Sequence, residues 1–289
     1  MPELPEVETI ARTLAPCVVG KHINTIKVLN EGTWQGDITP EQVCQMPRLI
    51  TGTGRRAKVL LLNFGHHPDR ARQDIGAEID QNSIQGLAFH LKMSGKVFAY
   101  PTGTAPGKHT RVIFGLGDGS LLFFDDTRKF GYVRALTPKS LQNWPFWQKL
   151  GPEPFSLDSR QFIQLFQPRK TAIKALLLDQ EIIAGVGNIY ADESLFRAGI
   201  NPAAPGNSIP EAKLCLLHTT LQEVLQEAID ACGSSIRDYR DAKGDAGSFQ
   251  NSFRVYGRAG QSCVVCKTPL SHARIAGRGT VFCNKCQNR

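Results

Sequence analysis

The chain has 289 residues, of which 41% are hydrophobic and 21% charged, and its net charge is +8. This length and balance are typical of one large or two folded domains and exclude a disordered chain. No apolar run approaches the ~18 residues of a membrane helix, and the acidic, proline-containing start is unlike a signal peptide. We therefore expect an intracellular protein with no membrane partner.

The first predicted element is a helix that begins near Leu4 and ends at Pro16. Its apolar residues recur at helical spacing (positions 4, 7, 10, 11 and 14), and Pro5 is tolerated in a first turn. Short apolar or β-branched runs separated by Gly, Pro, Asn and Asp then predict strands, which indicates a sandwich or barrel. The expected strands cover residues 22–29, 58–64, 87–90, 97–100, 110–116 and 120–124.

Later segments change in character. Residues 65–86 are polar and charged and are predicted to form a long mobile loop, and the proline- and tryptophan-rich residues 136–152 are predicted to link two domains. Helical periodicity follows, and residues 233–247, which are small, polar and glycine-containing, are expected to form a flexible loop. The expected helices cover residues 171–178, 189–198 and 211–231.

Residues 251–289 carry seven Lys and Arg and no Asp or Glu. Clustered positive charge favours a nucleic acid or another anionic partner, with a solvated charged surface as the alternative. The same region holds two CxxC pairs, Cys263 with Cys266 and Cys283 with Cys286. Four thiolates at this spacing predict one structural Zn²⁺ with a β-hairpin between the pairs, and such a site leaves no open position for chemistry.

The N-terminus offers a nucleophile. Removal of Met1 would leave Pro2 as a secondary amine, and an α-amino group titrates at about pH 8, so part of it is unprotonated at neutral pH. Such an amine attacks a sugar C1′ to give an iminium, with Glu3 beside it to move protons. Proline at position two is also common in unrelated chains, so this motif does not decide the function alone.

Six motifs occur in order along nearly the whole chain. They are residues 2–9 (PELPEVET), 55–58 (RRAK), 90–95 (HLKMSG), 126–131 (DTRKFG), 185–191 (GVGNIYA) and 277–280 (GRGT). Together with the four cysteines they resemble the formamidopyrimidine-DNA glycosylase family. The resemblance implies an α+β fold, in which an N-terminal helix and β-sandwich domain precede a helical domain with a helix–two-turns–helix and a β-hairpin zinc finger.

The resemblance also implies catalytic roles. Pro2 is the nucleophile that attacks C1′ of the damaged nucleotide, and Glu3 is the neighbouring acid or base. Lys58, expected on a strand, assists β-elimination, with an ordinary exposed strand lysine as the alternative. Arg278, on the zinc hairpin, binds phosphate and is linked to δ-elimination. Cations are needed there because the sugar–phosphate on either side of a lesion is negatively charged.

A base inside a duplex must be flipped out before it is attacked, and the vacated stack needs an apolar wedge and a hydrogen-bond donor. By resemblance, Met93 and Phe130 are the wedge and Arg128 is the donor, with core packing as the alternative for the two apolar residues. A structural imidazole is the alternative for each histidine among the implied backbone contacts. These contacts are His90, His109, Arg128, Arg169, Lys170, Lys174 and Asn188.

Three features depart from the family's pattern. Lys129 stands where an Arg is expected. This keeps the positive charge and loses the two parallel hydrogen bonds that a guanidinium can donate. Lys92 stands where a Gly is expected directly before Met93. Residues 65–86 are longer than the usual connection between the flanking strands.

The sequence therefore predicts four parts: a catalytic β-sandwich domain with its leading helix (1–135), a linker (136–152), a helix–two-turns–helix domain (153–248) and a zinc-finger hairpin (249–289). The predicted function is that of a monomeric, bifunctional DNA glycosylase and AP lyase in base excision repair, cytoplasmic or nucleoid-associated. It would remove 8-oxoguanine and formamidopyrimidines from double-stranded DNA and cut the strand by β,δ-elimination. Residues 128–130 and 233–247 favour purine lesions.

Two other functions are compatible with the same motifs. One is the sister activity of endonuclease VIII, which prefers oxidised pyrimidines. The other is a catalytically inactive protein that binds damaged DNA, which would be indicated by the loss of Pro2, Glu3 or Lys58; all three are present.

Overall fold

The computed structural model describes residues 1–65, 80–236 and 239–287, so most of the predicted loop at 65–86 lies outside the described residues. The chain forms two compact units. The first unit consists of Met1–Pro2, Glu6–Gln148 and Ser234–Gly247, and the second of Glu3–Pro5, Lys149–Gly233 and Ser248–Arg289.

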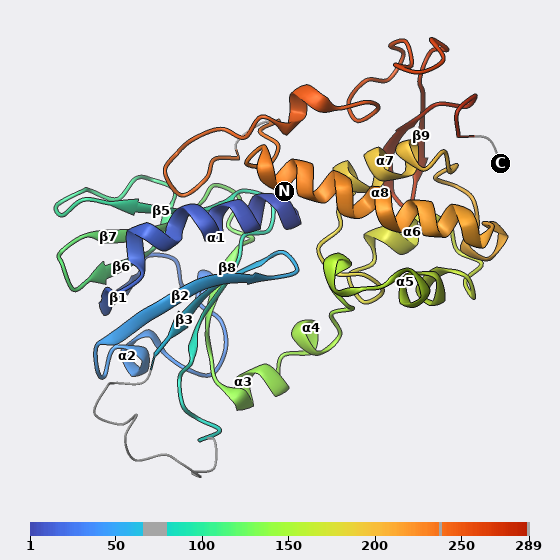
Figure 1. The fold of residues 1–289 in the computed structure, drawn as a ribbon. Helices are drawn as coiled ribbons and strands as arrows, with labels where there is room; N and C mark the ends of the chain where they lie inside the picture. Colours follow the sequence, from blue (N-terminus) through green and yellow to red (C-terminus); the bar gives the residue numbers. More distant parts are fainter. Residues whose placement is uncertain (66–79, 237–238, 288–289) are drawn as a thin grey trace. The chain divides into compact units, whose positions relative to one another are not determined.

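The first unit is built on an eight-stranded antiparallel sheet with the order β5-β7-β6-β1-β2-β3-β4-β8 (Figure 1). Its helices are α1 (Leu4–Val18), α2 (Pro40–Val43), α3 (Pro138–Gln142), α4 (Pro145–Gln148) and the short 3₁₀ helix Glu31–Thr33, of which α1 begins in the second unit. Its strands are β1 (His22–Val28), β2 (Arg48–Arg56), β3 (Val59–Phe64), β4 (Gly86–His90), β5 (Gly95–Tyr100), β6 (Thr110–Leu116), β7 (Leu121–Asp126) and β8 (Tyr132–Leu136).

The sheet folds into a sandwich because its two halves are joined by one short pairing. The register between β1 and β2 consists of the pairs His22–Leu49 and Ile23–Arg48. Apolar side chains of both halves, such as Phe114 and Phe89, pack in one core together with the apolar face of α1. The predicted helix and β-sandwich are confirmed. Strands β2 and β8 were not predicted.

Helix α1 does not end at Pro16 as predicted. It continues to Val18, and the amide N–H of Val19 still donates to the Ala15 carbonyl. Proline removes one helical hydrogen bond and crowds the preceding turn, which is normally costly inside a helix. Here the last turn is held by Val18, which is fully buried in the sandwich core.

The outer face of β3, β4 and β8 carries a second cluster of apolar side chains. Because neighbouring residues on a strand point to opposite faces, Leu60 enters the sandwich core while Val59 enters this cluster. Trp144, Phe146 and Trp147 from the α3–α4 segment cover it. Residues 136–148, predicted as part of a linker, therefore belong to the first unit and are anchored by burial of their aromatic rings.

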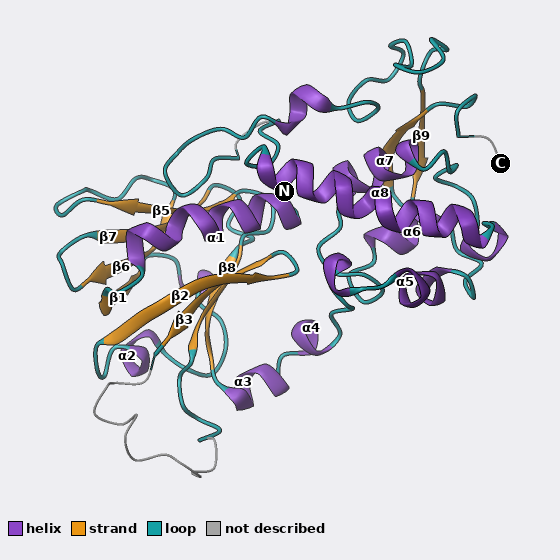
Figure 2. Ribbon diagram, viewed as in Figure 1, coloured by secondary structure: helices purple, strands orange, loops and turns teal. Residues whose placement is uncertain are grey.

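The second unit is helical apart from a two-stranded hairpin near its end (Figure 2). Its elements are the 3₁₀ helices Pro154–Ser156, Gly206–Ser208 and Phe249–Ser252, the helices α5 (Ser159–Phe166), α6 (Ile173–Leu178), α7 (Asn188–Arg197) and α8 (Glu211–Asp230), and the strands β9 (Ser271–Ile275) and β10 (Arg278–Phe282). The core of this unit combines the apolar faces of the four α-helices with Leu4 and Phe249.

The stretch 233–247, predicted as a flexible loop of the helical domain, is grouped with the first unit from Ser234 on. Three of its described residues, Ser234, Tyr239 and Ala242, are hydrogen-bonded to α1. The Ser234 amide donates to the buried Glu6 carboxylate at 2.8 Å, and the Ala242 amide donates to the Thr13 hydroxyl at 3.2 Å. These contacts connect residues more than 200 positions apart, which sequence periodicity does not reveal.

Candidate active site and DNA-contact residues

The Glu3 carboxylate lies at the N-terminus of α7. Glu3 is 4% exposed, and its Oε1 accepts from the Ile189 amide at 3.4 Å. A negative charge is favourable there because the first amides of a helix have no partner within the helix. A Cβ added at Gly187 would overlap the Glu3 carboxylate, so the glycine in this turn is required by the close approach of Glu3.

The turn before α7 also holds the backbone next to Glu3. The Leu4 amide donates to the Gly185 carbonyl at 3.1 Å, and Gly185 has a φ of 89°, which favours glycine. The Gln180 side chain fixes this turn from the other side, accepting from the Gly185 amide and donating to the Val186 carbonyl, both at 2.9 Å. Sequence reasoning missed Gln180, because an isolated glutamine carries no motif.

Strand β10, which begins at Arg278, is joined to the helices of the second unit. Asn188 Nδ2 donates to the Gly279 carbonyl at 3.1 Å, and Lys174 Nζ donates to the Thr280 hydroxyl at 2.7 Å. The amide of Val281 donates to the Asp192 carboxylate at 3.3 Å. The structure thus brings the exposed Arg278 close to the N-terminus of α7 within one unit.

Lys174 forms a buried ion pair with Asp192, with 2.5 Å between Nζ and Oδ1. Burial lowers the pKa of Lys174 and raises the pKa of Asp192 to about 6, and their mutual attraction opposes both shifts. Lys174 is completely buried, so its amine is not presented on the surface as the predicted contact with a DNA backbone requires. Its contacts instead hold β10 in place, and Asp192 was missed by sequence reasoning.

Lys58 and Pro2 both belong to the first unit and are both buried. Lys58 does not lie on a strand as predicted. It occupies the two-residue turn between β2 and β3, where Ala57 adopts a φ of 53° to reverse the chain. Lys58 directly precedes Val59, which pairs with His90 across β3 and β4, and the positive charge of Lys58 contributes to lowering the pKa of His90.

His90 is buried on β4 and contacts the rings of Tyr132 and Phe146. Burial, together with the charges of Lys92 and Lys58, lowers its pKa to about 3, so the imidazole is neutral at physiological pH. Its Nδ1 accepts from the Lys92 amide at 3.2 Å, which assigns the proton to Nε2. A contact of His90 with DNA would therefore be made by a neutral donor and not by a cation.

Met93, Arg128 and Phe130 come together on two loops of the first unit. Met93 is 48% exposed and Phe130 55% exposed, which excludes the core-packing alternative for both. The Arg128 guanidinium lies 5.1 Å from the Phe130 ring centroid, and its Nη1 lies 3.0 Å from the Met93 sulfur. The three predicted wedge residues thus form one exposed cluster, which we call the wedge cluster.

The two loops of the wedge cluster are joined through Asp126. Like Gln180 and Asp192, Asp126 was not predicted as a site residue from the sequence. Its buried carboxylate accepts from the Ser94 hydroxyl at 2.5 Å, from the Arg128 amide at 3.1 Å and from the Gly131 amide at 2.7 Å. Such a charged acceptor with several donors fixes loop geometry strongly. Lys129, which departs from the family pattern between Arg128 and Phe130, is exposed and has a φ of 59°.

The other predicted DNA-contact residues are all at least partly exposed. Arg169 and Lys170 are exposed between α5 and α6 in the second unit, and His109 is partly exposed directly before β6 in the first unit. Asn188 is partly exposed at the start of α7. Burial does not prevent any of these four from reaching a phosphate.

The four C-terminal cysteines form a metal site. Their sulfur atoms all lie within 4.8 Å of one another, with Cys263–Cys286 at 3.9 Å and Cys266–Cys283 at 3.4 Å. Four sulfurs around a tetrahedral Zn²⁺ stand about 3.8 Å apart, so the side chains fit one structural zinc ion. Cys263 and Cys283 are buried against Val255, Leu270 and Val281.

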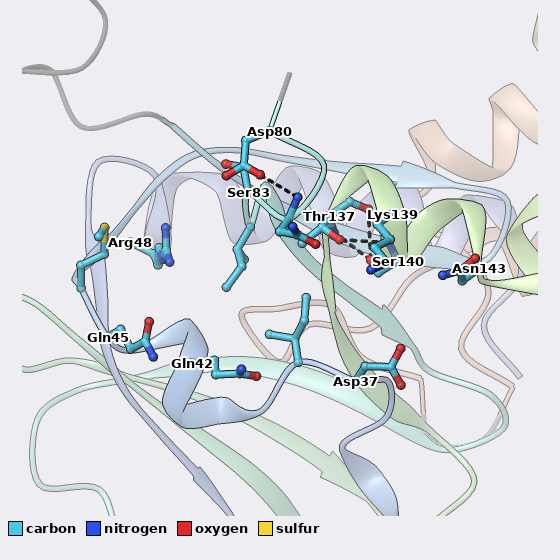
Figure 3. Close-up of a pocket in the computed structure, with 14 residues that line it drawn as sticks. Asp37, Gln42, Gln45, Arg48, Asp80, Ser83, Thr137, Lys139, Ser140 and Asn143 are labelled. Carbon is cyan, nitrogen blue, oxygen red and sulfur yellow. Dashed lines mark hydrogen bonds between the residues drawn. The ribbon is translucent and has the colours of Figure 1, made fainter. Parts of the chain in front are cut away.

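A separate polar pocket of about 490 Å³ opens in the first unit, between the region of α2 and the start of α3 (Figure 3). Its lining includes Asp37, Arg48, Asp80 and Lys139, and none of the predicted site residues borders it. No helix within residues 1–65, 80–236 or 239–287 is long and apolar enough to cross a membrane.

Three family models match consecutive parts of the chain. They are the formamidopyrimidine-DNA glycosylase N-terminal domain at residues 1–133, the formamidopyrimidine-DNA glycosylase H2TH domain at 150–240, and the zinc finger found in FPG and IleRS at 260–289. The formamidopyrimidine-DNA glycosylase of Nitratidesulfovibrio vulgaris is 44% identical, covering 99% of this chain and 100% of that protein. The chain belongs to the formamidopyrimidine-DNA glycosylase family.

Solved structures of this family share the fold. A Lactococcus lactis FPG variant in complex with Fapy-dG-containing DNA superposes with a TM-score of 0.86 at 32% identity, with full coverage of both chains. The wild-type Lactococcus lactis enzyme in complex with DNA containing an oxidised pyrimidine superposes with a TM-score of 0.84, also at 32% identity and full coverage. Family membership makes this chain a DNA glycosylase of DNA repair that carries a zinc finger.

The family resemblance implies that Glu3 transfers protons, and a Cβ at Gly187 would displace its carboxylate. Substitution of Gly187 by alanine should therefore lower the rate of base excision about 100-fold, because proton transfer is typically worth that much. The rate is measured under single-turnover conditions on a lesion-containing duplex. Gly54→Ala is the matched control, because a Cβ at Gly54 meets no atom within 4 Å. Equal rates for the two variants would contradict the role of the close approach to Glu3.

His90 should make the free energy of unfolding depend on pH in the acid range. Its pKa is about 3 in the folded protein against about 6.5 when exposed, so the unfolded chain binds the additional proton. Stability is therefore fully present above pH ~6.5 and is lost as the pH falls towards 3, by at most about 1.4 kcal/mol per pH unit. His90→Gln should flatten this slope in urea unfolding curves.

Proposed function

We propose that the chain is a bifunctional DNA glycosylase and AP lyase that excises oxidised purines, namely 8-oxoguanine and ring-opened formamidopyrimidines, and acts in base excision repair. The observation that carries this proposal is the position of Glu3. The Glu3 carboxylate is buried at the N-terminus of α7, and Pro2 directly precedes Glu3 in the chain. Glu3, the acid or base, is thus fixed one residue from the secondary amine of Pro2. A Schiff-base mechanism needs these two groups together.

The proposed reaction begins once Met1 has been removed. The lone pair of the Pro2 nitrogen forms a bond to C1′ while the glycosidic bond to the damaged base breaks, and Glu3 moves the accompanying proton. The sugar ring opens and leaves an iminium between Pro2 and C1′. Loss of a C2′ proton then expels the 3′ phosphate, and a second elimination expels the 5′ phosphate, so no oxidant or cofactor is consumed.

Cationic residues support the elimination steps in this proposal. Lys58 in the β2–β3 turn and Arg278 at the start of β10 are the candidates for stabilising the phosphate leaving groups, since hydrogen bonds from cations to phosphate are strong. The link from Asn188 and Lys174 to β10 supports the position of Arg278. Arg169, Lys170 and Asn188 are the proposed contacts with the DNA backbone, and His109 is a further one.

The wedge cluster supports base flipping. Two exposed apolar side chains, Met93 and Phe130, stand beside an exposed guanidinium from Arg128. Large apolar side chains are unfavourable in contact with water, and their burial in the base stack is favourable. We assign Met93 and Phe130 to the space left by the flipped nucleotide and Arg128 to the orphaned base.

Oxidised pyrimidines are the second candidate substrate class. Among the solved relatives, the Lactococcus lactis enzyme has been captured both with Fapy-dG DNA and with oxidised-pyrimidine DNA, so the fold accommodates both lesion types in that protein. The chain's loop at 233–247 and the pair Arg128 and Phe130 favour the purine assignment through their resemblance to the family pattern, from which Lys129 between them departs.

The test is borohydride trapping on duplexes that carry 8-oxoguanine opposite cytosine, with thymine glycol as the second substrate, followed by intact mass and peptide mapping. A covalent adduct on the N-terminal proline peptide with 8-oxoguanine DNA is the expected result. An adduct with thymine glycol alone would transfer the assignment to oxidised pyrimidines. No adduct with either substrate, from protein lacking Met1, would indicate a damage-binding protein without lyase activity.

A further inference from the structure

Lys92 has a backbone conformation that lysine rarely adopts. Its φ is 50°, in the left-handed region where a Cβ is crowded by the backbone and glycine is preferred. It directly precedes Met93 of the wedge cluster, and its amide donates to His90 Nδ1 at 3.2 Å. A non-glycine residue persists in such a conformation only when surrounding contacts hold it there.

The side chain of Lys92 is held by two aromatic rings. Its ammonium lies 5.6 Å from the centroid of Tyr132, on β8, and 5.9 Å from the centroid of Phe146, on α4. Both distances fall in the range of cation–π attraction, which strengthens when the cation is partly removed from water. Lys92 is partly buried, and this burial lowers the pKa of its amine. We call the two rings the aromatic seat.

The aromatic seat is rigid because its rings are packed by others. Tyr132 and Phe146 each contact the His90 ring, with centroids 5.4 and 5.2 Å apart, and each contacts Trp144, at 6.2 and 5.5 Å. Trp144 is 5% exposed and stacks on Trp147. The seat therefore belongs to the buried cluster that covers the outer face of the sheet, and it offers Lys92 a fixed position.

The loop that carries Met93 is held at its two ends and by Lys92 between them. Leu91 is buried, and the Gly95 amide donates to the Leu91 carbonyl at 2.9 Å, which closes a tight turn. Ser94 is bound to Asp126. With Lys92 drawn towards the aromatic seat, the neighbouring Met93 side chain is left exposed beside Arg128.

We propose that Lys92 is a positioning residue for the wedge: its ammonium, held in the aromatic seat, fixes the loop so that Met93 is presented before DNA binds. This inference rests on the proposed role of Met93 in base flipping. Preorganisation lowers the ordering cost of insertion, so its loss slows the insertion step and leaves chemistry on an already accessible sugar unchanged.

The test compares Lys92→Met, which keeps the chain length and removes the charge, with Lys92→Arg, which keeps the cation and stacks on aromatic rings. The first readout is stopped-flow fluorescence of 2-aminopurine next to a tetrahydrofuran site in a duplex, which needs no bond cleavage. Lys92→Met should slow the fluorescence change about tenfold, the rate equivalent of losing one partly buried cation–π contact. Lys92→Arg should stay within about twofold of the unmodified protein.

Phe146→Leu removes one ring of the aromatic seat and completes a double-mutant cycle. It should slow insertion like Lys92→Met, and the double variant should be no slower than either single variant, because both remove the same contact. Unmodified rates in Lys92→Met, or additive effects in the cycle, would overturn the proposal. Circular dichroism melts of all variants identify any that fail to fold. If a Phe146 variant fails to fold, the comparison of Lys92→Met with Lys92→Arg tests the proposal.

A second readout separates this proposal from the proposed function. A single-stranded oligonucleotide with an abasic site has no base stack to fill, so Lys92→Met should cleave it within about twofold of the unmodified rate. If the unmodified protein cleaves no abasic DNA, the lyase proposal fails, while the 2-aminopurine signal still reports on Lys92. An equal loss of both readouts in Lys92→Met would show a general structural defect and overturn the positioning role.

Discussion

Replacement of Pro2 by glycine should abolish most strand cleavage while binding to damaged DNA is retained. The variant still has an N-terminal amine after Met1 is removed, but it loses the secondary amine that gives a cationic iminium without further proton loss. We expect the single-turnover cleavage rate to fall at least about 100-fold, which corresponds to about 2.7 kcal/mol in the barrier. Binding to a duplex with a tetrahydrofuran site, measured by fluorescence anisotropy, should change less than about threefold.

The control for this experiment is Pro5→Ala. Pro5 belongs to the same N-terminal motif and lies in the first turn of α1, but its nitrogen is part of a peptide bond and cannot act as a nucleophile. This variant should keep cleavage and borohydride trapping. A Pro2→Gly protein that cleaves at the unmodified rate would remove Pro2 from the mechanism, and equal losses in both variants would indicate a local folding defect.

Local patterns predicted the elements whose residues alternate or repeat regularly. The strand at Thr110–Leu116 and the helices α6 to α8 lie where apolar spacing placed them, to within two residues. Strand β2 was missed because its sequence, RLITGTGRR, contains two glycines and two adjacent arginines. The strand forms nonetheless because β3 pairs with it along its length and β1 pairs with it at its start. A local sequence window does not reveal such pairing partners.

Site residues were predictable where they belong to motifs and not where they act through burial. Met93 and Phe130 were expected as the wedge and Arg128 as the hydrogen-bond donor, roles that need exposed side chains, and all three side chains are exposed. Lys174 was expected to contact the DNA backbone, but its partner Asp192 lies 18 positions further on and both are buried. A motif gives the residue type that chemistry needs, whereas the ion pair depends on the packing of α6, α7 and β10. The same holds for Gln180, which belongs to no motif, and for the loop-fixing contacts of Asp126, which begins the motif 126–131 but acts through burial.

Loss of one cysteine of the metal site should weaken binding to all DNA, damaged or undamaged. In Cys283→Ser the cluster keeps three thiols, and the substituted residue is one that is fully buried in the small core of the hairpin region. Metal binding contributes directly to folding in sites of this kind, so the hairpin that begins with Arg278 should lose its defined structure. We expect the variant to bind less than one zinc ion per chain and its affinity for a duplex to fall about tenfold or more.

Cys232→Ser is the matched control, because Cys232 is exposed after α8 and lies outside the cluster. Zinc content by mass spectrometry, duplex affinity by anisotropy and proteolysis of residues 249–289 should all remain unchanged in it. The loss in Cys283→Ser should be reproduced by treating the unmodified protein with a strong chelator and reversed by added Zn²⁺. Normal affinity in the chelated protein would mean that the hairpin holds Arg278 through Lys174, Asn188 and Asp192 alone, without the metal.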